Sequence, residues 1–219
     1  MRYINFHCHR FKQASENIQV VSINVDEAIY EGIPGNCTVG IHPWQCEHKD
    51  VEAWINQLES VCKNPNVIAI GEIGLDRLRG GGLEMQSKIL LAQAEIARRT
   101  NKPIVIHCVR AWGELIKALS DAELLSVKKA IHGFRGKAEL AIQLVNLNYY
   151  LSFGSILVDP TPELAEALTV VPLNRLFFET DISEMPIDEV YAAASDILDI
   201  PVEELGQQLE KNFSEFFRT

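Results

Sequence analysis

Short apolar runs alternate along the chain with longer amphipathic segments. The apolar runs predict eight β-strands, at Tyr3–Phe6, Val20–Val25, Cys37–Ile41, Val67–Ile70, Pro103–Ile106, Lys129–Ile131, Tyr149–Phe153 and Leu176–Phe178. Apolar residues at helical spacing predict helices at Val51–Val61, Glu84–Arg99, Trp112–Leu119, Lys137–Val145, Pro162–Val170, Pro186–Leu198 and Val202–Phe217. This alternation is typical of parallel α/β folds.

The strands read as continuous apolar runs, which favours burial on both faces. We therefore expect an α/β fold of the (β/α)8 TIM-like barrel class, with a doubly wound open sheet as the alternative. Two early connections, Arg10–Gln19 and Asp26–Asn36, are too short and irregular for a crossover helix with its loops. The barrel should be incomplete there, with early helices missing or shortened.

The length and composition indicate an ordinary globular chain. A chain of 219 residues, 47% of them hydrophobic, predicts a single domain over residues 1–219. No stretch resembles a signal peptide or a membrane span, so we expect a cytoplasmic protein with no membrane partner. Five scattered cysteines without a CxxC pair predict reduced thiols, not a disulfide framework or a structural zinc site.

Histidines and acids stand where several predicted strands end. His7 and His9 close the first apolar run, and at positions i and i+2 of a strand their imidazoles share a face and can reach one metal ion. Glu72 follows Val67–Ile70 between glycines that permit close approach of the backbone. Each feature alone is also compatible with an ordinary polar strand end.

The same placement recurs on three further strands. His107 and His132 each end an apolar run, and Asp181 follows the last one. In a barrel these ends meet at the C-terminal face, where active sites of this architecture lie. Six side chains are therefore predicted metal ligands: His7, His9, Glu72, His107, His132 and Asp181.

A resemblance to a known family rests on motifs in a fixed order. They are HxH at 7–9, Gly-Ile-His42-Pro, Gly-Glu72-x-Gly-Leu-Asp76, Pro-x-x-Ile-His107, His132-x-Phe-x-Gly and Glu-Thr-Asp181. Together they resemble the TatD-type deoxyribonuclease family, an amidohydrolase-like barrel, over nearly the whole chain. The resemblance implies two divalent ions, with His7, His9 and Asp181 on one, His107 and His132 on the other, and Glu72 bridging them.

The expected function is divalent-metal-dependent hydrolysis. The resemblance implies a deoxyribonuclease that cleaves phosphodiester bonds with a metal-activated water, with Asp181 and Glu72 as catalytic groups and His42 near the substrate. The mixed ligands admit Zn, Mn, Co or Mg. A small-molecule amidohydrolase-like enzyme acting on an amide or ester, and a catalytically silent metal-binding scaffold, are the alternatives.

The charge distribution bears on the substrate. Lys and Arg number 20 against 30 Asp and Glu, a net charge of −10, so a nucleic acid would need a local basic patch. Basic residues do follow three metal-bearing strands: Arg77 and Arg79, Arg110, and Arg135 with Lys137. We predict that Arg77, Arg110 and Arg135 contact phosphates. The alternative is solvated cations paired with Asp76 or Glu84.

The chain also departs from the family pattern. Asn5 stands where the family usually has an aspartate, Arg135 replaces a common serine, and the stretch after Asp181 is not the usual one. The short connection after the first strand and the altered stretch after Asp181 remove walls around the predicted metal site. We therefore expect the site to open through a wide, shallow mouth suited to single-stranded DNA or frayed ends. Trp44, on the loop beside His42, is a candidate for base stacking or for packing.

Overall fold

The computed structural model describes residues 2–10, 16–33 and 35–218. Chain contacts separate two compact units. The central unit is Val21–Lys129, and the terminal unit combines Met1–Val20 with Ala130–Arg218.

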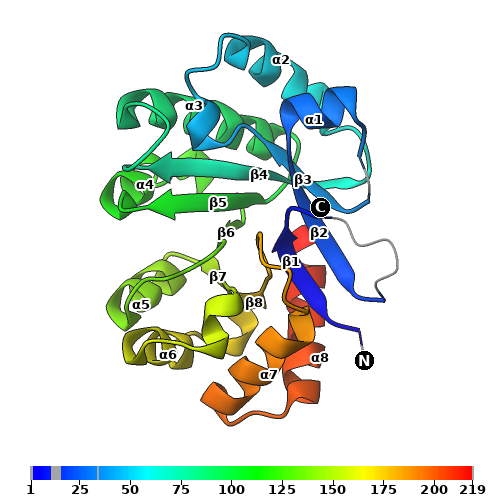
Figure 1. Ribbon diagram of the computed structural model, residues 1–219. Coiled ribbons are helices and arrows are strands. Elements are labelled where there is room, and N and C mark those ends of the chain that lie inside the picture. The colour runs from blue at the N-terminus through cyan, green and yellow to red at the C-terminus, as the bar shows by residue number, and fades with distance from the viewer. Residues whose placement is uncertain (1, 11–15, 34, 219) are drawn as a thin grey trace. The chain divides into compact units, whose positions relative to one another are not determined.

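Parallel strands in chain order form the sheet of the central unit (Figure 1). They are β2 (Ile18–Asn24, whose first residues belong to the terminal unit), β3 (Cys37–Gly40), β4 (Val67–Asp76) and β5 (Ile104–Val109). β2 pairs with β3, β3 with β4 and β4 with β5, all in parallel. The register sets Gly74 opposite His107. The carboxyl ends of β4 and β5 therefore carry their polar residues side by side.

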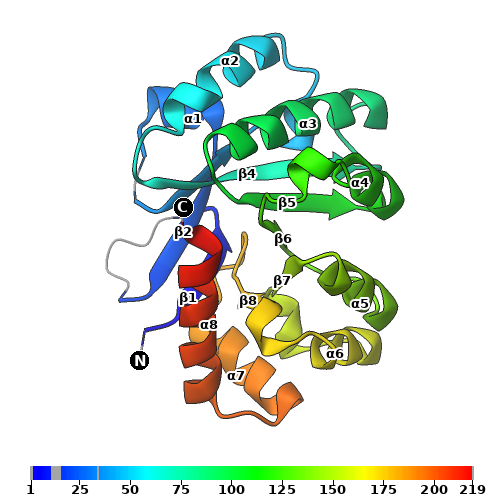
Figure 2. The ribbon, with the colours of Figure 1, turned by 180° about the vertical axis from the view of Figure 1, so that it is seen from behind.

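Helices cover the sheet of the central unit. They are α1 (Val25–Tyr30), α2 (Val51–Val61), α3 (Leu83–Arg99) and α4 (Trp112–Ala118), with 3-10 turns η1 (Pro43–Gln45) and η2 (Ala122–Leu124). Figure 2 shows α3 lying along β4, which it contacts. Its buried face includes Ile89, Leu90 and Ala94, at the spacing of one helical face. This burial of apolar side chains holds α3 on the sheet.

The terminal unit joins strands from both ends of the chain. They are β1 (Ile4–Cys8), β6 (Lys129–Ile131, whose first residue belongs to the central unit), β7 (Tyr149–Phe153) and β8 (Leu176–Phe178). β7 and β8 are parallel, and Cys8 forms a parallel bridge with Asp181. Asn5 adds two bonds to Thr180: its amide donates to the hydroxyl at 2.8 Å, and its carbonyl accepts the Thr180 N–H at 3.0 Å. In place of the family's usual aspartate, Asn5 thus fixes β1 beside the segment that carries Asp181.

Four helices complete the terminal unit. They are α5 (Ala138–Asn146), α6 (Pro162–Thr169), α7 (Ile187–Leu198) and α8 (Val202–Phe217), with 3-10 turns η3 (Ser155–Val158) and η4 (Leu173–Arg175). The core is aromatic: Phe6 stacks on Phe177 with ring centroids 4.2 Å apart, and Phe216 of α8 meets Phe6 edge-on at 5.7 Å. These rings bury large apolar areas and fasten α8 to β1 and β8.

Each predicted strand and helix has a counterpart, with one difference that affects the site. β4 continues through Asp76, so Glu72 lies inside the strand, where we expected it to follow the strand. In the described part of the second short connection, the helix is the six-residue α1. Positions 11–15 of the first connection and position 34 of the second lie outside the described residues. No helix among the described residues is long and apolar enough to cross a membrane. The single domain stays a prediction.

Candidate metal site

Each unit brings three of the predicted site residues together. In the central unit, His42, Glu72 and His107 offer donor atoms that all lie within 4.8 Å of one another. In the terminal unit, His7, His132 and Asp181 do the same. We call these groups the central cluster and the terminal cluster.

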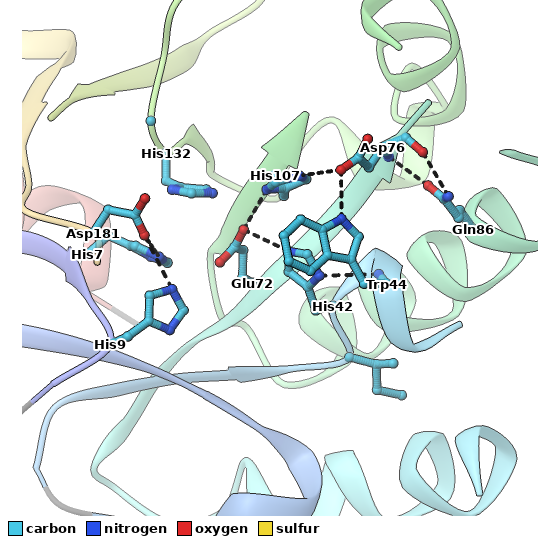
Figure 3. A network of polar contacts seen from close by, with 12 residues as sticks. His7, His9, His42, Trp44, Glu72, Asp76, Gln86, His107, His132 and Asp181 are labelled. Atoms are coloured by element: carbon cyan, nitrogen blue, oxygen red, sulfur yellow. Dashed lines mark hydrogen bonds and ion pairs between the residues drawn. The ribbon is translucent and has the colours of Figure 1, made fainter. Parts of the chain in front are cut away.

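Glu72 is the middle of the central cluster (Figure 3). Its Oε1 lies 2.7 Å from His107 Nδ1 and 3.1 Å from His42 Nε2, and the side chain is only 6% exposed. The glycine at 74 permits this approach: its φ is +153°, and a Cβ there would lie 1.9 Å from the His107 carbonyl oxygen. Only glycine therefore fits at position 74, in agreement with the prediction that the glycines around Glu72 permit close approach of the backbone.

Asp76 orients the other nitrogen of His107. Asp76 Oδ2 lies 3.4 Å from His107 Nε2 and accepts the Trp44 indole N–H at 2.7 Å, while its Oδ1 accepts the Leu78 N–H at 2.8 Å. Burial raises the pKa of Asp76, but the hydrogen bonds from Trp44, Leu78 and His107 outweigh it, so the pKa lies below its ordinary value. An ionised Asp76 favours a proton on Nε2 and leaves Nδ1 as the donor atom toward a metal.

The terminal cluster is built around Asp181. Its Oδ1 lies 3.4 Å from His9 Nε2 and 3.9 Å from His7 Nε2, and the His7 ring stacks on His132 at 4.2 Å. His7 is fully buried, whereas His9 is 40% exposed. Burial raises the pKa of Asp181, but the hydrogen bond from His9 and the electrostatic interactions with His7, His132 and His9 outweigh it, so the pKa lies below its ordinary value.

Glu179 is a site residue that sequence reasoning missed. It lies at the end of β8, fully buried, and its Oε1 accepts the Gly133 N–H at 2.8 Å and lies 3.3 Å from His132 Nδ1. Among the described residues, its Oε2 has no hydrogen-bond partner. The only sequence signal is its place in Glu-Thr-Asp181. With Nδ1 of His132 facing Glu179, Nε2 is the nitrogen through which His132 would hold a metal.

The donor sets suit the ions expected from the sequence. Each cluster combines imidazole nitrogens with one carboxylate, a mixture that zinc, manganese or cobalt accepts and that magnesium prefers less. The clusters are groups of neighbouring donor atoms, and the assignment of ligands to two ions stays a prediction. His132 lies with His7 and Asp181, and His42, expected at the substrate, lies among the donors of the central cluster. Glu72 as a bridge stays a prediction.

The predicted phosphate-binding arginines have unequal surroundings. Arg77 is engaged: its Nε donates to the Arg110 carbonyl at 2.7 Å and its guanidinium pairs with Glu114, not with Asp76 or Glu84. The side chains of Arg110 and Arg135 are exposed. Arg135 also lines a small pocket of about 120 Å³ beside Asp181. Arg110 and Arg135 are therefore the better candidates for phosphate contacts, and the wide mouth stays a prediction.

Comparison with known proteins places the chain in a family. The sequence profile described as TatD related DNase matches residues 23–218. An uncharacterized metal-dependent hydrolase of Buchnera aphidicola is 30% identical over 149 residues, which are 65% of this chain and 56% of that protein. The uncharacterized metal-dependent hydrolase YjjV of Escherichia coli is 28% identical over 197 residues, 82% of this chain and 75% of that one. The chain thus spans little more than half the length of the Buchnera relative.

Solved structures show the same fold. The crystal structure of YjjV, 24% identical in the structural alignment, matches with a TM-score of 0.81 over 100% of this chain and 98% of that one. A TatD-family hydrolase from Entamoeba histolytica, 16% identical, also gives a TM-score of 0.81 with the same coverage. The expected (β/α)8 TIM-like barrel class is confirmed. On the family profile and this fold, the chain belongs to the TatD-related family of metal-dependent hydrolases.

Proposed function

We propose that the protein is a deoxyribonuclease that hydrolyses phosphodiester bonds and needs divalent metal ions. The observation that carries the proposal is the pair of histidine and carboxylate clusters in a chain of the TatD-related DNase family. His42, Glu72 and His107 would hold metal in the central unit, and His7, His132 and Asp181 in the terminal unit. A bound divalent ion polarises the scissile oxygen and lowers the pKa of a water.

The protein side chains then perform two tasks. Asp76 and Glu179 orient His107 and His132 through the ring nitrogens that face away from the donor positions. Asp181 stays ionised because its pKa lies below the ordinary value, so it is available to accept a proton from water. Neither task depends on which divalent ion is present.

Charge favours an anionic substrate. The predicted ligands comprise four neutral imidazoles and two carboxylates, so two divalent ions would leave a positive centre in a chain of net charge −10. Exposed Arg110 and Arg135 add cationic groups that suit phosphate oxygens. We propose single-stranded DNA or frayed ends as substrate, with weak binding that depends strongly on salt.

A substrate panel tests the function. Single-stranded DNA, duplex DNA, RNA and a neutral amide are incubated with protein stripped of metal, and again after manganese or zinc is added. We expect cleavage of single-stranded DNA that is lost on stripping and restored by metal, and that falls strongly in His107→Ala and His132→Ala. Lys211→Ala, on the exposed side of α8, is the control.

Other outcomes would replace the proposal. Turnover of the amide without phosphodiester cleavage would support a small-molecule hydrolase. Metal binding without any turnover would support a silent scaffold. Full DNA cleavage in excess chelator would contradict metal dependence.

A further inference from the structure

Trp44 is unusually placed for a large aromatic residue. It follows the candidate ligand His42 by two positions, and its side chain is 49% exposed. Its backbone N–H donates to His42 Nδ1 at 3.2 Å, and its ring lies 4.7 Å from the His42 ring and 6.0 Å from the His107 ring, centroid to centroid. A half-exposed indole contributes less to the core than a buried one, yet it lies directly beside the central cluster.

A hydrogen bond to a buried carboxylate fixes the orientation of the Trp44 indole. Nε1–H donates at 2.7 Å to Asp76, which is itself only 2% exposed (Figure 3). The backbone N–H of Asp76 donates to Gln86 Oε1 at 2.7 Å, which ties the strand end to α3. A ring held in this way loses little further freedom when a ligand stacks on it.

Arg79 lies over the same ring. Its guanidinium carbon is 4.7 Å from the Trp44 ring centroid, a cation–π geometry. The loop that carries Arg79 is held by the Gln86 amide nitrogen, which lies 2.8 Å from the Arg79 carbonyl and 3.2 Å from that of Gly80. Gly80 is packed so closely that a Cβ there would lie 2.3 Å from the Pro43 carbonyl oxygen. The loop and the Trp44 segment are therefore set against each other.

We propose that Trp44 and Arg79 form a binding subsite for one nucleotide of the substrate, next to the central cluster. The base stacks on the exposed indole, and the guanidinium pairs with a flanking phosphate. Every nucleobase has a π-face, so such a surface binds single strands with little sequence preference. A duplex keeps its bases stacked on one another, so the subsite selects unpaired nucleotides. The inference rests on the proposed function and names which part of a DNA strand the central unit contacts.

An abasic scan of the ligand tests the subsite. Labelled single-stranded 12-mers, each with one base removed at a different position, are titrated by fluorescence anisotropy against the wild type, Trp44→Ala, Trp44→Phe and Leu78→Ala. Leu78 is the matched control because it is an apolar residue of the loop that carries Arg79, and its side chain is 60% exposed. Titrations are run in chelator and again with metal and phosphorothioate backbones, so binding is measured apart from cleavage.

The subsite predicts a specific coupling between protein and ligand. Removing one base should weaken binding to the wild type at one or two adjacent positions, by roughly 5- to 150-fold. Trp44→Ala should lose that discrimination, Trp44→Phe should keep part of it, and Leu78→Ala should behave as the wild type. If the abasic profile of Trp44→Ala equals that of the wild type, the subsite is refuted.

Cleavage assays separate this result from the proposed function. DNA cleavage without any base-dependent coupling to Trp44 would refute the subsite and leave the nuclease standing. Base-dependent coupling without cleavage would support the subsite and count against the nuclease.

Discussion

Replacing Glu179 with glutamine should weaken metal binding in the terminal cluster without weakening the fold. The substitution keeps the shape of the side chain and removes its charge. In the wild type, Glu179 Oε1 lies 3.3 Å from His132 Nδ1. Loss of such a partner typically lowers metal affinity by about 10- to 100-fold. Because 3.3 Å is longer than a strong charge-assisted bond, we expect the lower end, about 10-fold, or about 1.4 kcal/mol.

The metal-free fold should respond differently. Glu179 is fully buried, and its Oε2 has no hydrogen-bond partner among the described residues, so its charge is poorly compensated. A neutral amide keeps an oxygen for the Gly133 N–H and removes the buried charge. The free energy of unfolding of the metal-free variant should therefore equal or exceed that of the wild type.

Two measurements on each protein check this pair of expectations. Zinc or manganese affinity is measured by competition with a chelating dye, and unfolding by urea in the absence of metal. Glu166→Gln, an exposed site on α6, is the control for loss of one negative charge. Metal affinity equal to that of the control would refute the orienting role, and a large loss of metal-free stability would show that Glu179 is needed for folding instead.

Three further perturbations follow from other parts of the chain. Burial lowers the pKa of Lys129 from 10.5 to about 8, so between pH 7 and 9 the unfolded chain binds more protons than the folded one and stability should rise with pH. In urea unfolding, the free energy of unfolding of the wild type should increase by about 1 kcal/mol more over this range than that of Lys129→Met. Parallel pH profiles of the two proteins would refute this. Gln86→Leu should leave buried carbonyls of the loop after β4 without their hydrogen-bond donor and lower the free energy of unfolding by about 1–3 kcal/mol. Amide hydrogen exchange in that loop should become faster, and unchanged exchange would show that other contacts hold the loop. Arg135→Gln should reduce the slope of log K for DNA binding against log salt concentration by about one. Arg77→Gln should reduce it by less, because the Arg77 guanidinium already pairs with Glu114. Equal slopes for the two variants would contradict that ranking.

The strand positions were predictable because their residues are apolar on both faces. The second half of β4 was not, because Gly71–Asp76 is composed of glycines, acids and only two apolar residues, a pattern that resembles a loop. Burial of Glu72 and Asp76 at the strand end depends on partners such as His107 and Trp44, which lie at least 31 residues away in the chain.

The sequence placed the predicted ligands at strand ends, but it could not show which of their side chains lie near one another. Which histidine meets which carboxylate depends on strand register and ring rotation, and neither is encoded in local spacing. His42 shows this: its motif indicated a position near the substrate, and only its 3.1 Å approach to Glu72 makes it a candidate ligand. Glu179 was missed because nothing in the sequence shows that its oxygen faces His132.

The composition of the terminal unit has a consequence for the order of folding. Asn5 of β1 bonds to Thr180, 175 residues later, and the hydroxyl of Tyr191 donates to the Ile4 carbonyl. Closing a loop of that length is slow, because the entropy of the intervening chain opposes the encounter. On a ribosome, β1 emerges before β8 and α7, so it pairs with the nearby start of β2 but lacks Thr180 and Tyr191 until those residues have been made. His7 and His9 should therefore be among the last side chains to reach their native positions. A metal ion that binds them at that stage would slow the dissociation of β1 from its partners.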